Sequence, residues 1–107
     1  MLMDRSDIYI KVRFKTNAEG GRKTPVKRKS PLGPDYYACP LIVDDNAYDC
    51  RLLIGDNEIE LGKYYEVPVK FLNIDLALPS LSVGKKITLW EGKEVANGEI
   101  LRIEKKS

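Results

Sequence analysis

Apolar and polar side chains alternate along several short stretches of this chain. In the run IYIKVRF and the lysine after it, every second residue is apolar, and these residues are Ile8, Ile10, Val12 and Phe14. Successive side chains of a β-strand point to opposite faces, so the alternation predicts a half-buried strand over residues 8–15. Its outer face carries lysine and arginine.

Further runs have the same character and are separated by turn-forming residues. They cover residues 36–43, 48–54, 64–72, 85–92 and 93–103. Asp44, Asp45 and Asn46 lie between the first two of these runs, which predicts a hairpin. Proline cannot donate to a strand ladder, so Pro68 is expected at an edge, a bulge or an unpaired position. In the last run the apolar residues do not share one face, which predicts a bulge or twist at Asn97-Gly98.

These strands must hide one apolar face, and no segment of ten or more residues shows helical periodicity. Antiparallel strands of this kind close on themselves or form a sandwich. The pattern predicts an all-β fold, a closed six-stranded antiparallel β-barrel, with a sandwich as the alternative. We expect one domain over residues 1–107, with a loose N-terminus at 1–6. A long loop at 26–35, which contains Pro31-Leu32-Gly33-Pro34, is a place for mobility or binding.

Several kinds of chemistry have no counterpart in the sequence. Histidine is absent, no phosphate-binding loop is present, and adjacent carboxylates such as Asp44-Asp45 are typical of a solvated turn. We expect no enzyme activity, no catalytic residues, no metal and no cofactor. The spacing of Cys39 and Cys50 fits no zinc pattern, and the cytosol would keep both thiols reduced, which favours two small core or interstrand residues over a disulfide.

Neither a signal peptide nor an apolar membrane span is recognisable, because the start MLMDRSD turns acidic early. The sequence therefore predicts a cytoplasmic protein without a membrane partner.

Charge is distributed unevenly along the chain. The net charge of +2 divides into +6 for residues 1–34 and −4 for the rest. Such asymmetry suits an anionic partner, although basic side chains also protect an exposed edge strand from unwanted pairing. The basic residues of the N-terminal part that we consider for binding are Lys11, Arg13, Lys15, Arg22, Lys23, Lys27, Arg28 and Lys29.

The order of several motifs resembles the C-terminal (third) β-barrel domain of elongation factor Tu. The motifs are EGGRKTP at residues 19–25, Pro34-Asp35-Tyr36-Tyr37, and Trp90-Glu91-Gly92 followed by Val95 and Gly98. The correspondence runs over nearly the whole chain, from about Asp7 to Ile103. The resemblance implies a stand-alone six-stranded barrel without the GTPase domain of that family.

In that family the domain touches the backbone of tRNA and meets other translation proteins. Carried over by position, the resemblance implies that Arg22 lies near phosphates of a tRNA stem and that Glu91 and Gly92 approach the same stem. This chain differs from the family at Asp35 and Asp44, where a carboxylate would repel phosphate.

Two hypotheses follow. The first is a non-catalytic module that contacts tRNA or the translation apparatus through its basic residues, and its affinity for RNA should fall with salt. The second is a protein-interaction or immunity/antitoxin-type protein that mimics the elongation factor domain and binds a translation factor or a toxin. Outward-facing aromatic residues, among them Tyr64 and Trp90, would then anchor the contact.

Overall fold

The computed structural model of this chain describes residues 6–28, 30 and 32–104. Short strands dominate it, with little helix. In chain order the elements are β1 (Ile8–Phe14), the 3-10 turn η1 (Asn17–Glu19), β2 (Tyr37–Val43), β3 (Asn46–Leu52), β4 (Tyr64–Phe71), α1 (Ile74–Ala77), η2 (Leu78–Ser80), β5 (Lys86–Trp90) and β6 (Glu94–Ile103).

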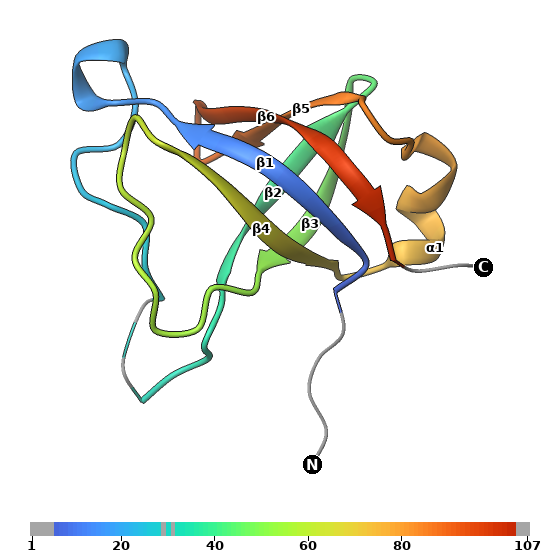
Figure 1. Cartoon of the computed structure of the whole chain (residues 1–107), viewed down its shortest axis with the longest axis horizontal. Coiled ribbons are helices and arrows are strands. Elements are labelled where there is room, and N and C mark those ends of the chain that lie inside the picture. Colours follow the sequence, from blue (N-terminus) through green and yellow to red (C-terminus); the bar gives the residue numbers. More distant parts are fainter. Residues whose placement is uncertain (1–5, 29, 31, 105–107) are drawn as a thin grey trace.

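The six strands form a closed antiparallel barrel in the order β1-β4-β3-β2-β5-β6. Figure 1 shows β1 between β4 and β6 on the near side, with the β2–β3 hairpin behind them. The predicted all-β barrel is thus confirmed, and the sandwich is not formed. Closure removes the free sheet edges that an open sheet of this size would expose.

Strand alternation directs every second side chain into the barrel. On β1, Ile8, Ile10, Val12 and Phe14 are fully buried, as the sequence predicts. The inward side chains of the other strands meet them in one core, with large members such as Leu41, Leu52, Ile87, Leu89 and Ile100. Burial of this apolar surface is the main force that closes the sheet.

The predicted hairpin is present, and its turn has unusual backbone angles. Asp44 and Asp45 connect β2 to β3 with φ values of 51° and 65°. Two consecutive positive values mark the type I′ turn, whose twist matches that of paired strands. The Asp44 side chain also forms an ion pair with Lys85, the residue before β5.

Pro68 lies at the position in β4 where its partner strand runs out. β3 pairs with β4 only from Cys50 to Leu52, and the next residue, Leu53, donates its N–H to the carbonyl of Pro68. Pro68 is a register partner of Tyr9 on β1, so only its β3 side is the unpaired position expected for it.

The predicted bulge at Asn97-Gly98 is wrong. Both residues pair regularly, and the register shifts instead at Leu101 against β1 and at Val95 against β5. Gly98 is required for a different reason, because a Cβ there would lie only 1.9 Å from the carbonyl oxygen of Lys11. β1 and β6 approach too closely at this point for any side chain.

A short helical segment, α1 followed by η2, closes one end of the barrel and was not predicted. It begins at Asn73, whose side chain accepts a hydrogen bond from the N–H of Leu76. In Figure 1 it lies at the right, at the opposite end from η1. None of the helices in the described part of the chain is long and apolar enough to cross a membrane.

Asp7 is a buried carboxylate just before β1, and no sequence pattern indicates its role. Its Oδ2 accepts a hydrogen bond of 2.8 Å from the N–H of Phe71, and its carbonyl accepts one from the N–H of Glu104. It thereby ties the ends of β4 and β6 to β1.

Residues 20–36 form the long connection between η1 and β2. Val26 in this connection is buried and forms an isolated bridge with Ile59 in the segment before β4. Part of the predicted loop at 26–35 is therefore anchored to the core. Of the expected loose N-terminus at residues 1–6, only Ser6 lies within the described residues.

Candidate binding site

The EGGRKTP segment begins with a tight turn that explains both glycines. Gly20 ends η1 with a φ of 89°, a left-handed conformation that glycine adopts without strain. At Gly21 a Cβ would lie 2.3 Å from the carbonyl oxygen of Lys15. The two glycines let the chain fold back onto the end of β1, and this role is structural.

Arg22 points away from this turn and binds four acceptors within the chain. Its Nε and Nη2 donate to the carbonyls of Thr24 and Pro25, at 3.1 and 3.5 Å. Its Nη1 donates to the hydroxyl of Tyr37 at 2.9 Å and forms a 2.5 Å ion pair with Glu91. The guanidinium carries five N–H groups, so most of its bonding capacity is used inside the domain.

The Arg22–Glu91 pair joins two motifs that lie 69 residues apart in the sequence. Glu91 stands in the turn between β5 and β6, and Tyr37 begins β2. The guanidinium of Arg22 also lies 5.4 Å from the centre of the Tyr37 ring. The residues that the resemblance places together are therefore neighbours in space.

A hollow with a volume of about 510 Å³ lies beside this pair. Its lining combines two cations, one carboxylate and two tyrosines with small apolar residues: Arg22, Lys27, Pro34, Tyr36, Tyr37, Ala38 and Glu91. A surface hollow of this size and composition has room for a phosphate or an extended backbone.

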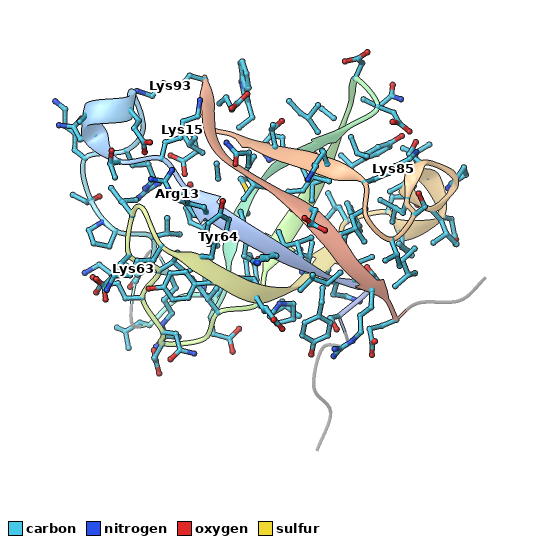
Figure 2. The ribbon with its side chains drawn as sticks, turned by 45° about the horizontal axis from the view of Figure 1, so that its top comes forward. Arg13, Lys15, Lys63, Tyr64, Lys85 and Lys93 are labelled. Carbon is cyan, nitrogen blue, oxygen red and sulfur yellow. The ribbon has the colours of Figure 1, made fainter. Side chains whose placement is uncertain are left out.

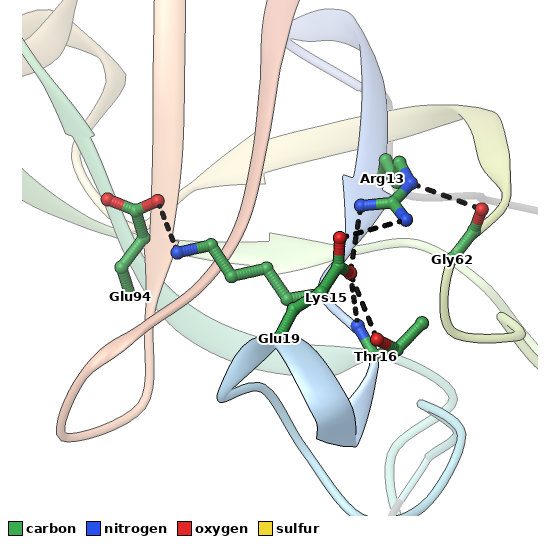
Figure 3. Close-up of polar contacts among 6 residues, drawn as sticks. All are labelled: Arg13, Lys15, Thr16, Glu19, Gly62 and Glu94. Atoms are coloured by element: carbon green, nitrogen blue, oxygen red, sulfur yellow. Dashed lines mark hydrogen bonds and ion pairs between the residues drawn. The ribbon is translucent and has the colours of Figure 1, made fainter.

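The basic residues at the end of β1 also have partners within the chain (Figure 3). Arg13 binds Glu19 at 3.1 Å and donates to the carbonyl of Gly62 at 3.1 Å. Lys15 forms a 2.9 Å ion pair with Glu94 at the start of β6. Each of these two cations is thus close to a carboxylate from another segment.

Glu19 is held by its own turn as well as by Arg13. Its Oε1 accepts hydrogen bonds from the backbone N–H and the hydroxyl of Thr16, at 2.8 and 3.1 Å. The Thr16 amide, followed by Arg13, lowers the pKa of Glu19 below its ordinary value. The carboxylate is therefore charged at neutral pH and offsets the charge of Arg13.

Lys11 occupies the middle of the outer face of β1. In register it stands between Glu66 on β4 and Glu99 on β6, and its Nζ lies 5.2 Å from the centre of the Tyr64 ring. A second hollow, of about 410 Å³, borders Lys11, Tyr64 and Glu99. The predicted basic face of β1 is therefore an alternation of cations and carboxylates.

The remaining candidate residues differ in how far they are engaged. Arg28 pairs with Asp56 at 2.6 Å, and Gly92 takes a φ of 74° in the β5–β6 turn. Within the described chain, Lys23 and Lys27 are exposed and form no ion pair. Lys29 lies outside the described residues.

Other lysines are spread around the molecule. Figure 2 shows Arg13, Lys15 and Lys93 toward one side and Lys85 toward the other, near the helical segment. Lys63 is paired with Glu60 at 3.0 Å. The fold thus gathers the predicted site only in part, around Arg22 with Lys23 and Lys27.

Sequence reasoning missed Tyr37 as a partner of Arg22. The resemblance indicated a strand there, but only the barrel brings the start of β2 next to the guanidinium. In residues 6–28, 30 and 32–104 no three His, Cys, Asp or Glu side chains are grouped so that they could hold a metal ion.

Compared with models of known protein families and with curated proteins, the chain matches none of them. The resemblance to elongation factor Tu therefore depends on its sequence motifs and remains a prediction.

Proposed function

We propose that this protein is a non-catalytic binding module that contacts the RNA backbone, with tRNA as the expected ligand. The observation that carries the proposal is the meeting of Arg22 and Glu91 beside a hollow that Lys27 also lines. These are the positions that the resemblance to the third domain of elongation factor Tu implies for RNA contact.

In this proposal the residues of the site have different tasks. Arg22 is held by Tyr37 and Glu91 and gives the surface its shape, with little bonding capacity left for a ligand. Lys23 and Lys27 are exposed and supply the mobile charges that reach phosphates. Contacts of this type recognise charge and shape rather than base sequence.

The test is tRNA binding measured at several salt concentrations. Replacing both Lys23 and Lys27 by alanine should weaken binding about tenfold. The slope of the logarithm of the affinity against the logarithm of the salt concentration should also become shallower by about one for each phosphate that is no longer neutralised. Lys63→Ala combined with Lys86→Ala removes the same charge from other surfaces and is the matched control. Equal losses in both double variants, or binding that salt does not change, would contradict the proposal.

A protein partner is the second candidate, and a specific surface favours it. Trp90 at the end of β5 is 41% exposed, and the adjacent outer face of β2 presents Ala38, Pro40 and Ile42 without any charge. Exposed tryptophan beside an uncharged surface is typical of a contact between proteins. Under this alternative, Trp90→Ala would abolish binding to a purified translation factor or toxin, while the Lys23/Lys27 variant would bind normally.

A further inference from the structure

Two cysteines stand directly opposite each other inside the barrel. Cys39 on β2 and Cys50 on β3 are register partners, and they are 6% and 3% exposed. Both are free thiols. The sequence favoured a pair of small core residues over a disulfide, but it did not show that the two face each other.

Their placement meets the geometric requirement of a disulfide. Directly opposed residues of antiparallel strands have Cα atoms about 4.5–5.5 Å apart, within the range of about 4.4–6.8 Å that a disulfide spans. The neighbouring Cys39 side chain and burial raise the pKa of the Cys50 thiol. The register thus places the two Cα atoms within the reach of a disulfide.

The hairpin that carries the thiols is attached to the barrel by short ladders. β2 pairs with β5 at two positions, Leu41↔Leu89 and Ile42↔Thr88, and β3 pairs with β4 at three. Both cysteines also border an outer hollow of about 340 Å³, together with Tyr36, Arg51 and other residues. Both side chains point into the barrel, so a small oxidant reaches the sulfur atoms only when the hairpin opens.

We propose that Cys39 and Cys50 form an oxidation site that closes into an intramolecular disulfide on reaction with a peroxide. One sulfur attacks a peroxide oxygen, the O–O bond breaks, and a sulfenic acid and one water form from hydrogen peroxide. The second sulfur then attacks the sulfenic sulfur, the S–S bond forms, and a second water leaves. The two thiols lose two electrons and two protons, and the peroxide is reduced.

The experiment exposes the intact protein to hydrogen peroxide, removes the oxidant with catalase, denatures the chain and alkylates free thiols. We expect a monomer that has lost the mass of two hydrogen atoms and takes up no alkylating reagent. Dithiothreitol should restore two reactive thiols. The oxidised protein should melt about 5 °C or more above the reduced protein, because a cross-link limits the unfolded chain.

The single variants Cys39→Ala and Cys50→Ala should each retain one reactive thiol and show no increase in melting temperature. The comparison of oxidised with reduced wild-type protein does not depend on whether these variants fold. Three results would overturn the proposal: two alkylated cysteines after peroxide, a covalent dimer, or oxygen gained on Cys39 or Cys50 rather than on a methionine. RNA binding plays no part in this test, so its outcome is independent of the proposed function.

Discussion

β1 and the β2–β3 hairpin lie on opposite sides of the barrel and differ in how they are held and in what they expose (Figure 1). β1 pairs along its length with both β4 and β6. The hairpin is fully paired within itself but joins its neighbours through only two and three register pairs. The outer face of β1 is charged, whereas that of β2 is uncharged.

The comparison shows why a basic segment need not produce a basic surface. Lys11, Arg13 and Lys15 project from β1, but the register and the turns bring four carboxylates beside them, those of Glu19, Glu66, Glu94 and Glu99. Exposed pairs of this kind contribute little stability, but they cancel the field that would attract a polyanion. Cations available to a ligand are found in the loop after β1.

The largest effect is expected where β1 and β6 approach most closely. Gly98→Ala would place a Cβ against the Lys11 carbonyl, and we expect a loss of about 3 kcal/mol or more in the free energy of unfolding. Gly33→Ala, whose Cβ would make only ordinary contacts, is the control and should change stability by less than about 0.5 kcal/mol. Urea denaturation measures both free energies of unfolding. A small loss of stability in Gly98→Ala would show that the two strands can move apart at this point.

Amide hydrogen exchange should distinguish the two regions directly. The amides of Ile10 and Val12 lie in a strand paired on both sides, whereas the hairpin amides that face β4 and β5 can be released by breaking two short ladders. We expect the hairpin amides to exchange about tenfold faster or more, because local opening exposes them without global unfolding. Equal protection would mean that the barrel opens as a single unit.

A charge reversal should affect β1 more than β2. Lys11→Glu would place three carboxylates in one row across β4, β1 and β6 and should cost about 1 kcal/mol at low salt. Ala38→Glu introduces the same side chain on the outer face of β2, opposite Arg51, and should be close to neutral. Thermal denaturation at low and high salt tests this, since added salt should reduce the difference.

The hairpin turn can be improved by one substitution. Asp45 has a φ of 65°, and glycine is preferred at this position of a type I′ turn. Asp45→Gly should raise the free energy of unfolding by about 0.5 kcal/mol, while Asp45→Ala keeps the strained angle and should lower it. If chemical denaturation shows that both variants lower stability equally, the Asp45 side chain contributes more than the backbone angle.

The smallest effect concerns Glu19 and its dependence on pH. Because folding lowers its pKa, its stabilising contribution is complete above the unfolded value of 4.5 and is lost as the pH falls through the folded value. In thermal denaturation, Glu19→Gln should be slightly less stable than wild type at neutral pH, with a difference that disappears in acid. A difference that stays constant across this range would show that the charge plays no part.

The core was readable from the sequence because alternation of side chains is a local property. Ile8 to Phe14 and the hairpin around Asp44 and Asp45 are formed as predicted. Bulge positions could not be derived in the same way, since they depend on how β6 fits two partners at once. The short segment α1 is too brief for any helical period to appear.

The candidate site, too, could be predicted from the sequence only in part. The sequence identified Arg22, the glycines before it and Glu91, but not the bond between Arg22 and Glu91 or the part played by Tyr37. It also identified the cations of β1 without their carboxylate partners. Contacts between residues so far apart along the chain exist only once the strand order and register are set.

By itself the sequence determined that this protein is built of strands, which segments form them and which face of β1 is buried, because these follow from side-chain periodicity within a few residues. The tertiary structure alone decided which charges cancel, that Arg22 meets Glu91, and that Cys39 faces Cys50. Barrel closure pairs strands that are distant in sequence, and the interactions of a charge or a thiol depend on distances in space.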